Sequence, residues 1–314
     1  MLLILGILAG VLLPIQTSVN TRLRGKVHTS YNASLVSFTV GFLFMLALFL
    51  ISGQGAALPF AQLAQAPFWI WMGGICGVCF LTGNIILLAR IGSVQTVIFP
   101  VLGQILMGLM IDHFGLFYAA QAPLTFLRVI GALLVISGVV IVSLAQEKQS
   151  RRAAAENTPG ATPQPWLWRM LGILTGTLCA MQTAINGCLG KVAGNPIFAS
   201  TVSFGTGMAI LVIVCILMRC KGSAKPSNLS VQKKHPWWIW IGGLLGSTCV
   251  LANIYLSSRI GTGMTIITFL IGSTAGGLLI DQFGWFQVPK KPINAAKLLG
   301  VLIMAAGAAI IKLF

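Results

Sequence analysis

The sequence repeats one of its own segments, and this repeat limits the folds that the chain can adopt. Residues 67–117 align without a gap with residues 236–286, and 23 of the 51 aligned positions are identical. The identical landmarks include the pairs Trp69/Trp238, Asn84/Asn253, Arg90/Arg259 and Asp112/Asp281. Self-similarity of this kind at a fixed separation is the signature of a duplicated structural unit. The chain is therefore predicted to be a tandem duplication.

The correspondence continues on both sides of this segment. The further matching positions are Gln16/Gln182, Asn20/Asn186, Ser37/Ser203, Phe38/Phe204, Gly41/Gly207, Gly131/Gly300 and Gly138/Gly307. They reach from the first apolar run of each half to the last. Each copy is therefore predicted to span a complete half of the chain.

The residue composition places both copies in a membrane. Hydrophobic residues make up 57% of the 314 residues and charged residues only 8%, whereas soluble globular proteins have roughly 45–50% and 25%. An apolar run of about 20 residues can cross the hydrocarbon core of a bilayer as a helix. Ten such runs are predicted, at 2–21, 33–52, 67–89, 93–111, 126–145, 167–187, 197–218, 237–257, 262–280 and 296–313.

Five predicted helices fall in each copy, and this odd number sets the orientation of the copies. The first repeat covers residues 1–145, a polar linker covers 146–165, and the second repeat covers 166–314. If the linker stays on one side of the bilayer, the second repeat must lie upside down relative to the first. The predicted fold is an all-α integral membrane protein of ten transmembrane helices, arranged as two inverted five-helix repeats.

The distribution of basic residues predicts the direction of insertion. Following the alternating helices puts all but four of the 20 Lys and Arg residues on one side of the membrane. The four exceptions are Arg128, Lys191, Arg259 and Lys312. Loops rich in Lys and Arg stay in the cytoplasm. The linker is therefore predicted to be cytoplasmic and both termini periplasmic.

Several other functional classes are disfavoured by the sequence. The formal net charge of +16 does not indicate nucleic-acid binding, because the basic residues lie at the ends of apolar runs, where they orient helices in the lipid bilayer. Seven cysteines are an odd number and lie in apolar runs, so they predict neither a closed disulfide framework nor a metal site. The histidines are scattered over separate loops. No cofactor, metal or enzymatic activity is predicted.

Paired amide side chains are the candidate substrate-binding residues. Gln16 and Asn20 are four residues apart and share one face of a predicted helix. The full set, with repeat equivalents, is Gln16, Asn20, Asn84, Gln182, Asn186 and Asn253. Buried amides in a membrane need hydrogen-bond partners. Two interpretations stay open, namely hydrogen bonding between closely packed helices and the lining of a substrate cavity.

The remaining candidates are charged residues at the ends of predicted helices. Asp112 is followed after 16 residues by Arg128, and Asp281 is followed after 16 residues by Lys297. Each acid and its base lie on the same predicted membrane side. Structural ion pairs are predicted, with a gating or coupling-ion role as the alternative. Arg90 and Arg259 end their predicted helices, where a cation suits the negative end of the helix dipole.

Three groups of motifs resemble a known family. They are Gly6-x-x-x-Gly10 with Gln16-x-x-x-Asn20, Asn84 with Arg90-Ile91-Gly92, and Asp112-x-Phe114-Gly115. Together with ten predicted helices they resemble the YdcZ-like branch of the drug/metabolite transporter (DMT) superfamily, as a fused two-repeat form. The resemblance implies a transporter of the bacterial inner membrane that exports its solute through a central cavity. Small multidrug-resistance relatives carry a glutamate in the first helix, and this chain has none there.

The predicted function is secondary transport. A small polar metabolite or drug-like solute would cross the membrane by alternating access, with the substrate held by the six amides. A channel-like pathway and a non-transporting membrane scaffold are the alternatives. The helices at 126–145 and 296–313 are predicted to lie at the periphery, where they could form a homodimer.

Overall fold

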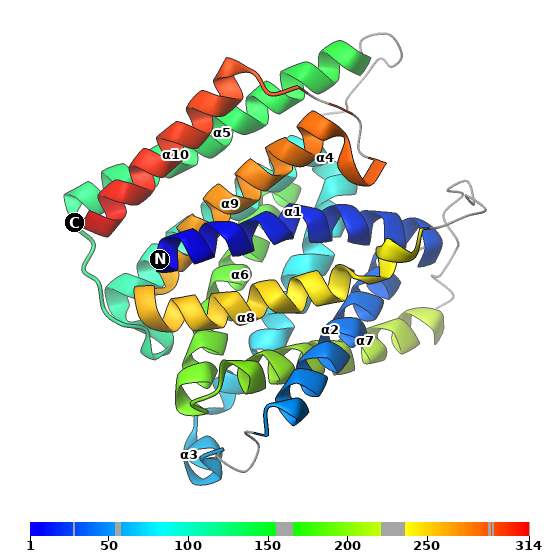
Figure 1. Cartoon of the computed structure of the whole chain (residues 1–314), viewed down its shortest axis with the longest axis vertical. Helices are drawn as coiled ribbons and strands as arrows, with labels where there is room; N and C mark the ends of the chain where they lie inside the picture. The colour runs from blue at the N-terminus through cyan, green and yellow to red at the C-terminus, as the bar shows by residue number, and fades with distance from the viewer. Residues whose placement is uncertain are drawn as a thin grey trace.

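The chain folds into a bundle of helices, seen here in a computed structural model (Figure 1). The structure describes residues 1–27, 29–53, 58–154, 166–220, 236–287, 290 and 292–313, and no strand occurs among them. The α-helices are α1 (Leu2–Val27), α2 (Ser30–Ile51), α3 (Phe60–Gln65), α4 (Gly73–Phe114), α5 (Phe126–Ala154), α6 (Trp166–Val192), α7 (Pro196–Cys220), α8 (Gly242–Ile260), α9 (Thr262–Phe283) and α10 (Ala295–Leu313). Short 3-10 turns are η2 (Phe68–Trp71), η3 (Leu116–Tyr118), η4 (Trp237–Trp240) and η5 (Trp285–Gln287).

Most helices match the predicted runs, and the differences lie at their ends. α1 and α6 continue to Val27 and Val192, one or more turns beyond the apolar runs. α5 continues to Ala154 and so takes up part of the predicted linker, whose residues 155–165 lie outside the described part of the chain. The short helix α3 was not predicted.

Helix α4 reverses direction along its length. A straight helix of its 42 residues would extend about 63 Å. Trp69 lies just before α4 and Phe117 just after it, yet their ring centroids are only 5.3 Å apart. The chain therefore runs out along a first arm, residues 73–87, and returns along a second arm, Thr96–Phe114. The two arms agree with the two predicted runs, although the backbone stays helical between them.

The second repeat makes the corresponding reversal with a break in the helix. Gly261 separates α8 from α9 and has a φ of +82°, a backbone conformation that favours glycine. The end of α9 is also brought back to the start of α8, because the rings of Trp238 and Phe286 lie 5.4 Å apart. The two repeats therefore build the same hairpin in different ways.

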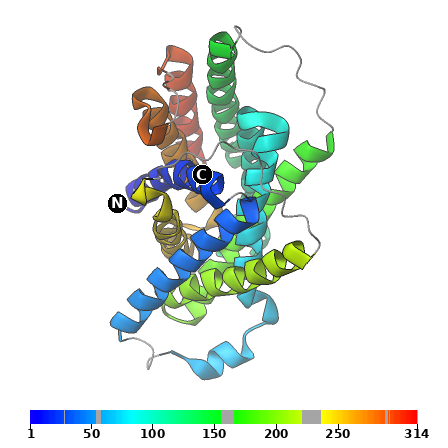
Figure 2. The same cartoon turned by 90° about the vertical axis from the view of Figure 1, so that its right-hand side faces the viewer.

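Helices of one repeat pack mainly against helices of the other. Figures 1 and 2 show α5 beside α10, α1 beside α8 and α9, and α2 crossing α7. Helix α6 packs against α4. The largest buried core joins residues of α4, α5, α6, α9 and α10. The repeats are thus interlocked, and neither forms a separate core.

Glycines allow these helices to approach backbone to backbone. A methyl group added at Gly176 of α6 would overlap the carbonyl oxygen of Pro100 in the second arm of α4. The equivalent Gly10 of α1 is packed in the same way against the carbonyl oxygen of Phe269 in α9. Small residues at such crossings are typical of membrane helices. The first repeat therefore packs on the second through α1 and α9, and the second packs on the first in the same way through α6 and α4.

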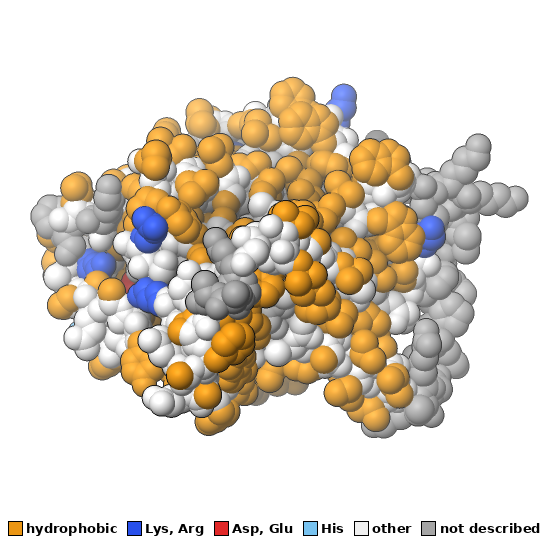
Figure 3. Space-filling view, turned by 60° about the horizontal axis from the view of Figure 1, so that its bottom comes forward, with side chains coloured by type: hydrophobic (Ala, Val, Ile, Leu, Met, Phe, Trp, Pro, Cys, Tyr) orange, Lys and Arg blue, Asp and Glu red, His pale blue; other side chains and the backbone are white. Residues whose placement is uncertain are grey.

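Apolar side chains cover much of the face seen in Figure 3, and many large hydrophobic side chains are exposed. Six described helical segments are long and apolar enough to cross a membrane, namely Leu2–Val27, Ser30–Ile51, Thr96–Phe114, Phe126–Lys148, Pro196–Met218 and Thr262–Phe283. The first arm of α4 and α10 are shorter apolar helices. Helices α6 and α8 are long enough, but glycine, hydroxyl and amide residues lower their mean hydropathy.

Separately expressed halves should assemble only with each other. Residues 1–160 and 161–314 made as two chains are expected to copurify in detergent, because each half supplies the glycine faces that the other covers. Size-exclusion chromatography of the tagged halves, alone and together, would measure this. A folded, monomeric 1–160 recovered without its partner would contradict the interlocked packing.

Candidate functional site

The asparagines of α1 and α6 make equivalent contacts. Asn20 Nδ2 donates a hydrogen bond to Ser37 Oγ of α2 at 3.3 Å, and Asn186 Nδ2 donates to Ser203 Oγ of α7 at 3.0 Å. Both asparagines are buried. Each therefore joins the first two long helices of its own repeat.

The same asparagines also contact the opposite repeat. The amide oxygen of Asn20 lies against Gly242, the first residue of α8, and that of Asn186 lies against Gly73, the first residue of α4. One turn away, Gln16 lies over Gly246 and Gln182 lies over Gly77. The predicted polar faces therefore rest on glycine faces, as the helix-packing interpretation expects.

Two buried amide oxygens have no hydrogen-bond partner among the described residues. They belong to Asn20 and Asn84. An unpaired amide in an apolar environment costs on the order of 2–7 kcal/mol relative to water. Water or a polar solute near these helices would remove this cost. The contacts with glycine and the two unpaired oxygens leave both interpretations of the amides open.

Asn20, Asn84, Asn186 and the hydroxyl residues beside them are called the polar layer below. Equivalent serines of α2 and α7 differ in their hydrogen bonds within this layer. Thr82 of α4 donates to Ser34 of α2 at 3.4 Å. The hydroxyl of Ser200, the repeat equivalent of Ser34, has no partner among the described residues. Leu251 stands where Thr82 would lie in the second repeat. Ser200 therefore lacks the hydroxyl partner that Thr82 provides to Ser34.

The six predicted amides do not gather into one cluster. Gln16 and Asn20 lie against α8, whereas Gln182 and Asn186 lie against the first arm of α4. Asn253 is half-buried. Within the described ranges, no hydrogen bond joins the two sets.

Asp112 links the two repeats through a helix terminus. Its carboxylate accepts hydrogen bonds from the backbone N–H groups of Thr262 at 3.0 Å and Gly263 at 2.8 Å, at the start of α9. Its side chain is only 3% exposed. A carboxylate at this position satisfies unpaired N–H groups and suits the positive end of the helix dipole.

The bases predicted to pair with Asp112 and Asp281 also contact backbone carbonyl groups. Arg128 Nη1 donates to the carbonyl oxygens of Ala122 at 2.8 Å and Pro123 at 3.3 Å. Lys297 Nζ donates to the carbonyl oxygen of Pro292, the equivalent of Pro123, at 3.1 Å. Both bases therefore fix the loop before the last helix of their repeat.

The other predicted charged residues also have particular surroundings. Asp281 accepts a hydrogen bond from Gln146 Nε2 of α5 at 3.2 Å. The guanidinium of Arg259 lies in the last turn of α8, 4.5 Å from the ring centre of Tyr255. Arg90 was predicted to end a helix but lies inside α4. Its side chain is outside the described part of the structure.

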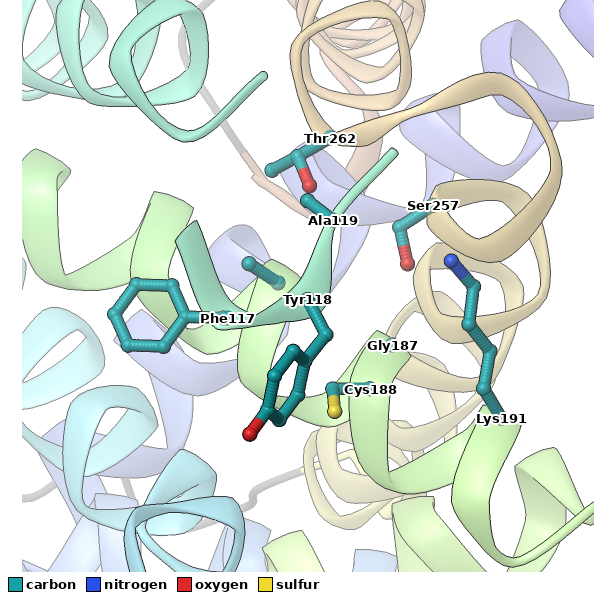
Figure 4. Close-up of a pocket in the computed structure, with 9 residues that line it drawn as sticks. Phe117, Tyr118, Ala119, Gly187, Cys188, Lys191, Ser257 and Thr262 are labelled. Carbon is teal, nitrogen blue, oxygen red and sulfur yellow. The ribbon is translucent and has the colours of Figure 1, made fainter. Parts of the chain in front are cut away.

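A small pocket at the end of α6 was not predicted from the sequence. Figure 4 shows its lining, which comprises Phe117, Tyr118, Ala119, Ala184, Gly187, Cys188, Lys191, Ser257 and Thr262. Lys191 reaches across toward Ser257 from the last turn of α6. The sequence placed Lys191 and Arg259 on the same predicted side of the membrane. This shared placement was the sequence feature that could have indicated the pocket. Among the described residues, no group of three His, Cys, Asp or Glu side chains could hold a metal.

These features define a class of protein. Long apolar helices, an apolar exterior and buried polar side chains at the interface of two matching halves are those of a multi-pass, all-helical membrane protein. The family described as "Putative inner membrane exporter, YdcZ" matches residues 1–141 and 167–310. The chain belongs to this family, which is described as one of inner membrane exporters. It is a multi-pass protein of the inner membrane.

Individual relatives agree with this assignment. The chain is similar to "Inner membrane protein YdcZ" of Escherichia coli (strain K12), with 31% identity over 101 residues. The match covers 32% of this chain and 66% of that relative, slightly less than two thirds of its length. A solved structure described only as "Crystal structure of protein" has a TM-score of 0.66 at 18% identity and covers 99% of this chain and 96% of its own. That likeness concerns the fold.

Proposed function

We propose that the protein is a secondary transporter that exports a small polar solute from the cytoplasm by alternating access. The observation that carries the proposal is the set of amides packed between the repeats, in which the side-chain oxygens of Asn20 and Asn84 lack hydrogen-bond partners among the described residues. Transporters built from repeats hold substrates at the repeat interface. The family description supports export as the direction.

The proposal includes ten membrane crossings in two inverted repeats. Reciprocal contacts support it: Asn20 lies on Gly242 as Asn186 lies on Gly73, and Gly41 lies against Phe204 as Gly207 lies against Phe38. The rings of Phe38 and Phe204, which are repeat equivalents, are 5.1 Å apart. A pseudo-two-fold axis between the repeats accounts for such pairs. Rocking of one repeat against the other would expose the polar layer to each side in turn.

Both termini are expected to face the periplasm. The prediction follows from the excess of Lys and Arg in loops on the opposite side. Fusions at Phe314 to alkaline phosphatase and to a cytoplasmically fluorescent protein would measure it. Phosphatase activity with a dark fluorescent fusion is the expected pair of results. The reverse pair would invert the assignment of every loop.

The polar layer fits neutral or zwitterionic solutes with several hydrogen-bonding groups. Its known side chains are amides and hydroxyls, which donate and accept hydrogen bonds but do not titrate near neutral pH. Asp112, the buried acid, is already engaged by two backbone N–H groups. A lipophilic cation would find no free carboxylate among the described residues of this layer.

Loss of either buried asparagine should weaken substrate binding. Asn20→Ala and Asn186→Ala are each expected to weaken binding about tenfold or more, because a bound polar group would lose a buried partner worth about 1.5 kcal/mol. A ligand-stabilisation screen on purified protein would find a binding solute, and titration calorimetry would compare the variants. Saturable counterflow in proteoliposomes would distinguish a carrier from a channel.

A matched control separates binding from packing. Ser203→Ala removes the hydrogen-bond partner of Asn186 but leaves the amide in place. A role in binding predicts a large effect for Asn186→Ala and a small one for Ser203→Ala. Equal losses from both changes would indicate helix packing alone. Normal binding by both asparagine variants would place the substrate elsewhere.

A further inference from the structure

The pocket at the end of α6 lies where both repeats meet. Tyr118 and Ala119 of the first repeat form one wall, and Ser257 and Thr262 of the second form the opposite wall (Figure 4). The pocket is small, with room for about one water molecule. It is therefore a small, partly open recess between the repeats, on the side that the charge distribution assigns to the periplasm.

The lining presents hydrogen-bond donors that have no partners. Thr262 is only 2% exposed, and its hydroxyl points into the pocket without a partner among the described residues. Lys191 is exposed, and its ammonium forms no hydrogen bond or ion pair within the described ranges. The hydroxyl and the ammonium can each donate a hydrogen bond to a water molecule or a ligand in the pocket. Ser257 already donates to the carbonyl oxygen of Ile254 at 3.2 Å.

The charges around the pocket favour an anion. No acidic residue lines it. Asp112 lies behind Thr262, but its carboxylate accepts the backbone N–H groups of Thr262 and Gly263 and is held away from the pocket. Arg259 stands over the ring of Tyr255 on the same helix as Ser257. The free groups that face the opening are thus a cation and a hydroxyl donor.

We infer that this pocket is the outer mouth of the solute path and that it binds an anionic oxygen group, a carboxylate or a phosphate. Lys191 supplies the charge, and Thr262 donates a hydrogen bond. The inference rests on the proposed transport function and narrows it, because zwitterions and anions would be favoured over cations at the exit. The mouth must widen to admit such a group, since its present volume holds about one water.

Cys188 provides a reporter inside the pocket. Its side chain lines the pocket beside Lys191 and is 5% exposed. Purified protein in phosphatidylcholine nanodiscs would be treated with negatively and positively charged methanethiosulfonates of similar size, and Cys188 labelling followed by peptide mass spectrometry. The negative reagent is expected to react at least about fivefold faster, and the ratio should fall with salt because screening weakens the field.

Two lysine variants test the cause of the preference. Lys191→Gln should bring the ratio close to one, whereas Lys191→Arg should preserve it. Lys26→Gln is the matched control, because Lys26 lies 4.7 Å from the ring centre of Trp240, outside the pocket lining. An unchanged ratio in Lys191→Gln, or an equal fall in Lys26→Gln, would overturn the inference.

Competition distinguishes the two sources of the anionic group. Protection of Cys188 by small carboxylates or inorganic phosphate in phosphatidylcholine nanodiscs would identify a solute site, and protection by added phosphatidylglycerol would identify a lipid headgroup site. Protection by none of them would also overturn the inference. The labelling assay does not require transport. If Cys188 labelling depends on the charge of the reagent but no counterflow is observed, only the transport function is refuted. Active counterflow with no selectivity would refute only the anionic mouth.

Discussion

Replacing Gly176 with alanine is expected to remove most of the folded protein. The new methyl group would overlap the carbonyl oxygen of Pro100, and a backbone group at a helix crossing cannot move aside as a flexible side chain can. Overpacking costs about 1–3 kcal/mol or more, and separating α6 from α4 would also disturb the largest core. The yield of monodisperse protein and its thermal midpoint in detergent would measure the loss.

Two further alanine variants make this result specific. Gly10→Ala places the same change at the equivalent crossing, against Phe269, and should have a similar effect. Gly25→Ala also lies in a helix, but no atom lies within 4 Å of the added group. That variant should be neutral or gain up to about 1 kcal/mol from helix propensity. Equal stability of Gly176→Ala and Gly25→Ala would refute the close crossing.

Replacing Asp112 with asparagine is expected to loosen the contact between the repeats at the end of α9. An asparagine oxygen can still accept one N–H group, but its amide nitrogen would face the other N–H donor. Loss of a charged acceptor to buried donors costs about 1.5–3 kcal/mol. If this contact holds the mouth closed, Cys188 should be modified about tenfold faster in the variant, together with a lower thermal midpoint.

The repeat equivalent gives the internal comparison. Asp281→Asn changes the matching acid, which lies beside Gln146 of α5 and on the opposite predicted side of the membrane. It should lower stability without speeding the modification of Cys188. If both variants speed the labelling of Cys188 equally, Asp112 acts only through general stability and does not hold the pocket at the end of α6 closed.

The sequence predicted the helical segments well because apolar length is a local property. The two runs at 67–89 and 93–111 match the arms of α4, although the helical assignment between them continues. Residues 146–154 were predicted as linker because they are polar, yet they extend α5. Polar composition rules out burial in lipid but does not stop a helix that has already begun.

The candidate site was predicted less completely, since its contacts depend on packing between distant segments. The repeat alignment identified Asn20 and Asn186 but could not show that each rests on a glycine of the opposite repeat. It identified Asp112 but could not show that the carboxylate accepts the backbone N–H groups of Thr262 and Gly263. Lys191 was noted only for its charge, because nothing in its neighbourhood along the chain indicates the pocket.

The interlocking of the repeats also has a consequence for synthesis on the ribosome. Gly10 is completed near the start of translation, but its packing surface at Phe269 is made some 259 residues later. At about 5–20 residues per second this delay is roughly 10–50 s. During that time the small-residue face of α1 has no partner from its own chain. Newly inserted α1 can therefore misassemble with other helices before α9 has been made.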